Sequence, residues 1–213
     1  PYEGLTKRLD DLAGCIDLMA IRSAEAGFDG KLDLVVLPEN AVCDENAKHA
    51  SERSIAFDGP VREVFRESAR KHNTYIVVPL FLDEGGSFSN AAVLVDRTGE
   101  VAGIYRKAHP VLARGAATYE GGVIAGSDYL VFECDFGRLG IQICFDIHFD
   151  EGWQALSDKG AEIVAWPTQS PQTILPAARA HNGCYYLISS TWRNNASILS
   201  PTATWPHKPN PIP

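Results

Sequence analysis

The sequence predicts an α/β fold in which helices cover a mixed β-sheet, or two such sheets packed together. Segments with apolar residues at helical spacing alternate along the chain with short apolar or β-branched runs. Hairpin patterns are interspersed among them, which indicates that the strands are not all parallel. Apolar residues make up 45% of the 213 residues and charged residues 22%, a globular composition that can supply such a core.

The first half of the chain contains two predicted helices and four predicted strands. We expect a helix over 5–26, ended by Gly27–Gly30, and a second helix that begins at Pro60, because apolar residues recur every three or four positions in both. The strand-like runs are 34–37, 75–82, 91–95 and 101–105. The polar turn Asp96–Gly99 joins the last two as a hairpin.

The second half continues the alternation of strands and helices. A strand pair is expected at 129–133 and 139–144, turning at Phe136–Gly137. The remaining predicted elements are helices at 152–159 and 173–184 and strands at 163–166 and 185–191. Five prolines in 200–213 predict an irregular tail, so we expect one domain over 1–199 followed by a proline-rich tail over 200–213.

Composition argues against several classes of protein. A net charge of −8 without a basic stripe makes nucleic acid a poor candidate partner. No apolar run approaches the ~20 residues that cross a bilayer, and the N-terminus lacks a signal-peptide layout, so no membrane partner is expected. Five scattered cysteines without a C-x-x-C pair argue against a disulfide scaffold and a zinc site. They favour a reducing compartment, and we expect a cytoplasmic protein.

Three apolar or β-prone runs each end on a chemically capable side chain. Glu39 follows the run from Leu34, Lys107 follows the run from Val101, and Cys144 closes the run from Leu139. A carboxylate, an ammonium and a thiol supply a base, a charge stabiliser and a nucleophile, which acyl transfer requires. Each residue alone is more often structural: a cap, a solvated strand end or a buried core thiol. The prediction therefore rests on the three together.

Two further residues are candidates. Glu120, in a turn before Gly121-Gly122, could hold Lys107 in place or act as a second acid/base, and a plain turn carboxylate is an equal alternative. His109 could mimic the base of a cysteine protease. A structural role is favoured for it, because Pro110 restricts its backbone.

The ordered set of motifs resembles the nitrilase superfamily of carbon–nitrogen hydrolases over about Leu32 to Asn195. The motifs are Pro38-Glu39, Tyr105-Arg106-Lys107-x-His109, Phe132-x-x-Asp135-Phe136-Gly137, Ile143-Cys144-Phe145-Asp146-Ile147 and Ala178-Arg179-Ala180-His181-Asn182. The resemblance implies that Glu39 is the general base, Lys107 stabilises the tetrahedral intermediate and Cys144 is the nucleophile. Glu120 is the match to the family's second glutamate.

The resemblance also implies a four-layer αββα sandwich and association through the helices at 152–159 and 173–184, as a homodimer or larger. The chain departs from the family pattern in three places. It begins almost at its first helix, it runs into prolines after Leu199, and Asp150-Glu151 stands where Pro-Glu is frequent. A domain truncated at both ends is one interpretation of the first two.

We therefore predict a hydrolase of a non-peptide C–N bond in an amide or N-carbamoyl compound, acting through a thioester and needing no metal or organic cofactor. The candidate pocket-lining residues are His148, Trp166, Gln169 and Phe145, although Trp166 is as readily explained by core packing. Nitrile hydrolysis by the same residues is the alternative. An inactive family member that serves as a binding or assembly module, and a redox-sensing thiol protein, also stay open.

Overall fold

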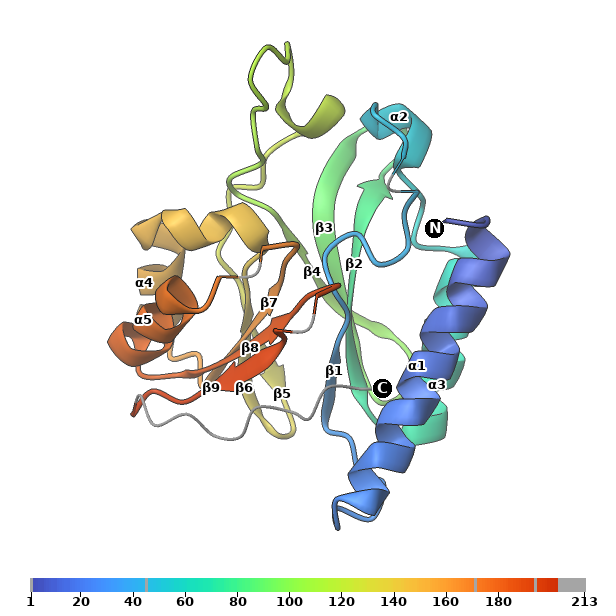
Figure 1. Cartoon of the computed structure of the whole chain (residues 1–213), viewed down its shortest axis with the longest axis vertical. Helices are drawn as coiled ribbons and strands as arrows, with labels where there is room; N and C mark the ends of the chain where they lie inside the picture. Colours follow the sequence, from blue (N-terminus) through green and yellow to red (C-terminus); the bar gives the residue numbers. More distant parts are fainter. Residues whose placement is uncertain (1, 45, 171, 194, 203–213) are drawn as a thin grey trace.

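The computed structural model describes residues 2–44, 46–170, 172–193 and 195–202. Two β-sheets pack face to face, and helices cover the outer face of each, so the molecule has four layers in the order α, β, β, α (Figure 1). The predicted fold class is confirmed.

The first sheet has four strands in the order β1-β2-β3-β4. They are β1 (Leu34–Val36), β2 (Tyr75–Asp83), β3 (Phe88–Val95) and β4 (Val101–Arg106). β1 runs parallel to β2, and the other pairs are antiparallel, so the sheet is mixed. The long helices α1 (Leu5–Glu25) and α3 (Gly59–His72) cover its outer face, and the short α2 (Ala50–Arg53) lies at one end (Figure 1).

The second sheet has five strands in the order β5-β6-β7-β8-β9. They are β5 (Val131–Cys134), β6 (Gly137–Ile141), β7 (Ile163–Pro167), β8 (Tyr186–Ser190) and β9 (Ser197–Leu199). β6, β7 and β8 are parallel, and the two outer pairs are antiparallel. Helices α4 (Asp150–Asp158) and α5 (Ile174–Gly183) cover its outer face. The 3₁₀ turns are η1 (Tyr119–Gly121) and η2 (Cys144–His148).

Three hydrophobic clusters hold the layers together. Strand alternation explains why one strand serves two of them, since Ile76 and Val78 of β2 face the helices while Val77 faces the other sheet. Leu94 and Ile141 meet in the cluster between the sheets. This inner layer sets the two sheets against each other and so decides how their loops meet.

Most predicted elements occur within a few residues of their predicted bounds. The short α2, η1, η2 and β9 were not predicted, and Cys144 opens η2 instead of ending a strand. β9 lies at the edge of the second sheet, where pairing with β8 supports a run of only three residues. Of the tail predicted over 200–213, residues 203–213 lie outside the described residues.

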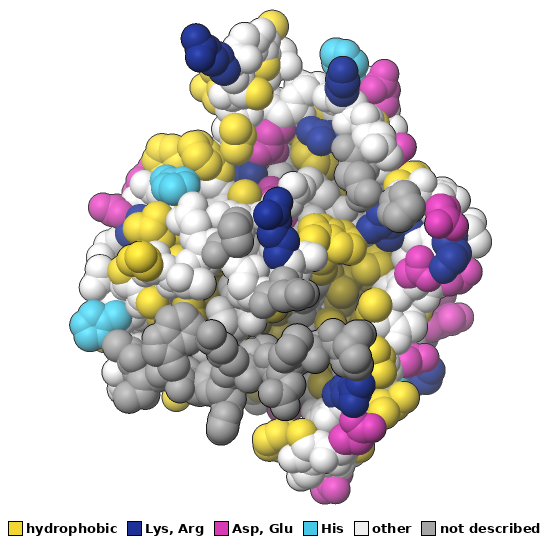
Figure 2. Space-filling view, viewed as in Figure 1, with side chains coloured by type: hydrophobic (Ala, Val, Ile, Leu, Met, Phe, Trp, Pro, Cys, Tyr) yellow, Lys and Arg dark blue, Asp and Glu magenta, His cyan; other side chains and the backbone are white. Residues whose placement is uncertain are grey.

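The charged surface is mixed in sign. In the space-filling view, acidic and basic side chains alternate along the edge formed by α1, and apolar side chains gather in the hollow beside it (Figure 2). Among the described residues, none of the helices combines the length and the apolar character needed to cross a bilayer.

Phe65 should be a principal anchor of α3 on the first sheet. Its side chain is fully buried and its ring stacks on Phe57 with centroids 6.3 Å apart. We expect Phe65→Ala to lower the free energy of unfolding by about 3–5 kcal/mol, because it leaves a cavity in the core. The measurement is urea denaturation, with Phe28→Ala as the control. Phe28 is 67% exposed, so its truncation should cost less than about 0.5 kcal/mol. Equal losses for the two variants would contradict the packing described.

Candidate active site

The predicted site residues lie on loops that follow strands of both sheets. Glu39 follows β1, Lys107 directly follows β4, and Cys144 follows β6 at the start of η2. The Lys107 backbone N–H donates to the Asn90 carbonyl at 2.8 Å, so the lysine continues the β3–β4 pairing beyond the end of β4. The first sheet thus supplies the carboxylate and the ammonium, and the second sheet supplies the thiol.

The Lys107 ammonium is buried between two carboxylates. Its Nζ lies 3.0 Å from Glu39 Oε1 and 2.7 Å from Glu120 Oε1, and the lysine is only 2% exposed. Burial acts to lower the pKa of Lys107, but the negative charges of Glu39 and Glu120 outweigh it and raise that pKa above the ordinary value. The lysine is therefore a fixed positive charge, and the predicted grouping of these three side chains occurs.

Asn90 of β3 joins the two glutamates and was missed by the sequence analysis. Its Nδ2 donates to Glu39 Oε1 at 3.0 Å and to Glu120 Oε2 at 2.9 Å, and the residue is 1% exposed. A signal for it exists in the sequence, because Ser89-Asn90 is the polar step at the start of an otherwise apolar strand. Asn90 holds both carboxylates toward the lysine.

Neighbouring loops hold both the side chain and the backbone of Glu120. The Val111 N–H donates to Glu120 Oε1 at 3.0 Å, and the Arg53 guanidinium donates to the Glu120 carbonyl at 2.6 Å. Gly121 is packed so closely that an added Cβ would lie 2.2 Å from the Lys48 carbonyl oxygen. Glu120 itself has φ +41°, a left-handed conformation that is unusual for a non-glycine residue.

The Cys144 thiol is protonated at neutral pH. Burial and then the negative charge of Glu39 raise its pKa to about 11, while Lys107 and hydrogen bonds from Gln169 and Thr168 act to lower it. Cys144 has φ +42°, and Asn40, next to Glu39, has φ +59°. The Trp166 indole N–H donates to the Cys144 carbonyl at 3.0 Å and helps to hold the turn. Nucleophilic attack by this sulfur requires a base.

The four predicted pocket-lining residues occupy different environments. Trp166 is fully buried in the cluster between the second sheet and its helices. Phe145 is partly buried, and its ring centroid lies 5.0 Å from that of the exposed His148. Gln169 is exposed and lines an open pocket of about 560 Å³ with Asn40 and Trp192.

This open pocket lies next to the backbone of Glu39, although Glu39, Lys107 and Cys144 are not among the residues that line it. Asn40 directly follows Glu39, and the Trp192 indole N–H donates to the Glu39 carbonyl at 2.9 Å. Charged residues at the start of the chain, from Glu3 to Asp11, complete the wall. Gln169 connects this pocket to the predicted nucleophile, because its backbone N–H is hydrogen-bonded to the Cys144 sulfur.

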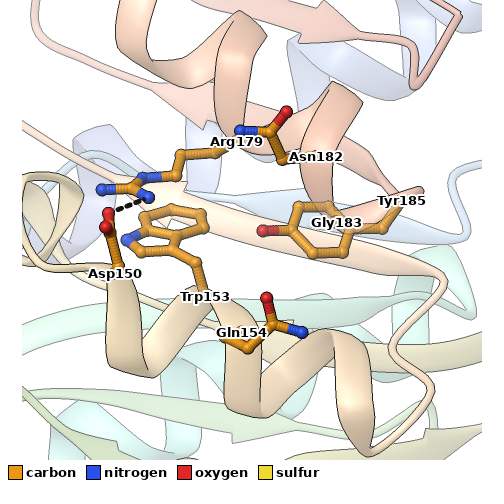
Figure 3. A pocket seen from close by; sticks show the side chains of 7 residues that line it. All are labelled: Asp150, Trp153, Gln154, Arg179, Asn182, Gly183 and Tyr185. Carbon is orange, nitrogen blue, oxygen red and sulfur yellow. Dashed lines mark hydrogen bonds and ion pairs between the residues drawn. The ribbon is translucent and has the colours of Figure 1, made fainter.

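A second, smaller pocket of about 200 Å³ lies between α4 and α5, and none of the predicted site residues lines it. In the close-up, Arg179 pairs with Asp150 above the ring of Trp153, and Asn182 and Tyr185 close the far side (Figure 3). In the part of the chain that the structure describes, no three His, Cys, Asp or Glu side chains are grouped to hold a metal ion.

Comparison with known proteins gives a family match over nearly the whole chain. The model of the carbon–nitrogen hydrolase family matches residues 6–205. The deaminated glutathione amidase of Yersinia enterocolitica is 30% identical over 200 residues, which are 83% of this chain and 67% of that protein. The citrullinase of Francisella tularensis is 26% identical over 126 residues, which are 58% of this chain and 43% of that protein.

Solved structures share the fold. An amidase from Nesterenkonia superposes with a TM-score of 0.76 at 21% identity, covering 95% of this chain and 79% of that one. A Saccharomyces cerevisiae member of the nitrilase superfamily superposes with a TM-score of 0.75 at 17% identity, covering 93% of this chain and 78% of that one.

Lys107→Met should destabilise the protein by about 3–5 kcal/mol, because two carboxylates would stay in the site without their cation. The free energy of unfolding, measured by urea denaturation, tests this. Lys71→Met is the matched control, since Lys71 pairs with Asp17 at an exposed position and its loss should change stability little. A loss for Lys107→Met no larger than that for the control would contradict the buried ion cluster.

Proposed function

Because the chain belongs to the carbon–nitrogen hydrolase family, we propose that it hydrolyses a non-peptide C–N bond of an amide or N-carbamoyl compound through a thioester on Cys144. The observation that carries the proposal is the buried Lys107 ammonium held between Glu39 and Glu120, with the Cys144 thiol within the electrostatic reach of Glu39 and Lys107. A base, a positive charge and a nucleophile in one site are the requirements of acyl transfer.

In the proposed mechanism Glu39 removes the proton from Cys144, because a thiol with a pKa of about 11 is not a thiolate at neutral pH. The sulfur then attacks the carbonyl carbon, and the negative charge that develops on oxygen is stabilised by Lys107 and by a backbone N–H of the η2 turn. Glu120 and Asn90 keep Lys107 and Glu39 in place.

The C–N bond breaks when Glu39 returns the proton to the departing ammonia or amine, leaving a thioester on Cys144. Water that gives its proton to the same carboxylate attacks the thioester, and the acid leaves as the sulfur regains the proton. The steps conserve atoms and charge and return the site to its starting state.

The open pocket beside Glu39 is the proposed substrate site, with Gln169 and Trp192 on its walls. The names of the two relatives point to an amide and to citrulline, a carbamoyl compound, as substrates of those proteins. Both support an amide or carbamoyl group for this chain. Phe145 and His148, which lie next to each other after Cys144, stay candidates for the opposite side.

We also propose that the protein assembles as a homodimer or larger through α4 and α5. The small pocket between these helices is lined by the polar side chains of Asp150, Gln154 and Asn182, which a second copy could contact. We propose separately that the protein is located in the cytoplasm.

The amide hydrolase proposal predicts ammonia release from a panel of amides, N-carbamoyl compounds and nitriles. Cys144→Ala should abolish it, by on the order of 10³-fold or more, because the nucleophile is lost. Cys184→Ala is the control, since Cys184 is an exposed cysteine that follows the C-terminal end of α5. Turnover of nitriles alone would favour the alternative reaction. No turnover by folded wild-type protein across the panel would favour a binding or assembly module.

Glu39→Gln should abolish ammonia release yet speed alkylation of Cys144. Removing the charge of Glu39 removes one cause of the raised pKa of Cys144, so more of the sulfur is thiolate at a fixed pH of about 8.5. The measurement is iodoacetamide labelling followed by mass spectrometry of each cysteine peptide. Cys134 is the internal control, because burial and Asp135, not Glu39, raise its pKa. Unchanged or slower labelling of Cys144 would contradict the inferred effect of the Glu39 charge on the pKa of Cys144, whereas the loss of ammonia release tests the base role of Glu39. Rapid oxidation of Cys144 to the sulfenic acid by peroxide, without any turnover of the amide panel, would instead favour the hypothesis of a redox-sensing thiol protein.

A further inference from the structure

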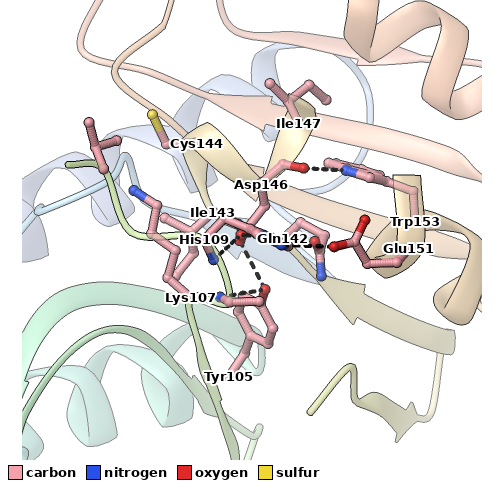
Figure 4. A network of polar contacts seen from close by, with 12 residues as sticks. Tyr105, Lys107, His109, Gln142, Ile143, Cys144, Asp146, Ile147, Glu151 and Trp153 are labelled. Carbon is pink, nitrogen blue, oxygen red and sulfur yellow. Dashed lines mark hydrogen bonds and ion pairs between the residues drawn. The ribbon is translucent and has the colours of Figure 1, made fainter. Parts of the chain in front are cut away.

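Asp146 is a fully buried carboxylate that the proposed mechanism does not use. It lies in η2, two residues after Cys144, and its two oxygens accept hydrogen bonds from both halves of the site (Figure 4). The Ile143 N–H and the Tyr105 hydroxyl donate to Oδ2, each at 2.9 Å. The His109 N–H at 2.9 Å, together with the His109 ring Nδ1 at 3.1 Å, lies against Oδ1.

The donors come from the two segments that carry the reacting groups. Tyr105 and His109 lie on either side of Lys107, on the first-sheet side, and Ile143 precedes Cys144 on the second-sheet side. Tyr105 is further fixed, because its hydroxyl accepts the Ala108 N–H at 3.3 Å. One carboxylate therefore ties the Lys107 segment directly to the Cys144 turn.

Apolar contacts between the sheets cannot by themselves fix the position of the Cys144 turn relative to the Lys107 segment. The hydrophobic effect is non-directional, whereas hydrogen bonds to a buried carboxylate fix both distance and orientation. We propose that Asp146 is a positioning residue, whose carboxylate holds the Cys144 sulfur in place against Lys107. This inference rests on the proposed function, since it assigns Asp146 a part in presenting the nucleophile.

The turn around Cys144 needs such support. Its φ of +42° is disfavoured for a residue with a Cβ, and such conformations persist only where surrounding contacts enforce them. Around it, the Asp146 N–H donates to the Ile143 carbonyl at 3.0 Å, while the Ile143 N–H donates back to the carboxylate. The Asp146 carbonyl accepts the Trp153 indole N–H at 2.8 Å, which anchors the turn to α4.

The His109 ring, which contacts the Asp146 carboxylate, is itself held in place by Phe149 and Glu151. Its ring stacks on Phe149 with centroids 3.8 Å apart, and its Nε2 lies 2.9 Å from Glu151 Oε1. A ring nitrogen thus faces a carboxylate at each end, and only the protonated imidazole can donate to both. The hydrogen bond to Asp146 is the main cause that raises the pKa of His109, in agreement with this geometry.

The test compares Asp146→Asn and Tyr105→Phe with wild-type protein, and Asp158→Asn, at the exposed end of α4, is the matched control. Two readouts are used: kcat and KM for ammonia release from the best compound of the panel, and the rate of Cys144 alkylation by iodoacetamide at pH 8.5. The second readout reports on the sulfur itself and needs no turnover.

For Asp146→Asn we expect kcat to fall at least tenfold with KM within threefold, because the substrate pocket is untouched. Cys144 alkylation should quicken at least threefold, because burial is the main cause of its raised pKa and a loosened turn exposes the sulfur. Tyr105→Phe removes one donor and keeps the ring, so smaller changes in the same directions are expected. If Asp146→Asn fails to fold, Tyr105→Phe decides.

Unchanged kcat and alkylation in folded variants with lowered melting temperatures would overturn the proposal, since Asp146 would then serve stability alone. A rise in KM alone, or a fall in kcat with unchanged alkylation, would also overturn it. If wild-type protein releases no ammonia from any compound, the proposed hydrolase function fails. Faster alkylation in Asp146→Asn would still support the positioning role.

Discussion

A desolvated ammonium is the constraint on which the rest of this structure depends. Lys107 can stay charged at 2% exposure only because Glu39 and Glu120 lie within hydrogen-bonding distance. Those carboxylates come from the loop after β1 and from η1, and Asn90 of β3 joins them. Three remote segments must therefore meet for the charge to be tolerated, which makes the strand order of the first sheet a condition for the site.

The second constraint is that the thiol belongs to the other sheet. The inner cluster, with Leu94 from one sheet and Ile141 from the other, brings the sheets together without specifying their register at the site. Hydrogen bonds connect the two sheets beside the candidate site, from the Tyr105 hydroxyl to Asp146 and from the Trp192 indole N–H to the Glu39 carbonyl. The apolar layer supplies cohesion, and a few hydrogen bonds supply alignment.

Local patterns were enough to predict most of the architecture. Apolar periodicity located the long helices and all strands except β9, because packing faces leave a period in the sequence. β9 and α2 could not be located, since elements of three or four residues depend on the neighbours they contact.

Glu39, Lys107 and Glu120 meet as expected, because strand ends and their loops share one edge. Asn90 was not predicted, because it lies at the start of an otherwise apolar strand, and the motif that contains Asp146 does not indicate which groups its carboxylate contacts. The number and direction of a buried carboxylate's partners are properties of the tertiary structure.

Asn40, Glu120 and Cys144 all have positive φ, a cost that falls on the residues in or beside the site. These strained backbone conformations lower the free energy of unfolding, and contacts elsewhere in the fold must offset that loss. Glycine at 120 or 144 would relieve the backbone while deleting the side chain. A search for heat-resistant versions of this protein, if guided by melting temperature alone, would therefore drift toward sequences that are sturdier and inert.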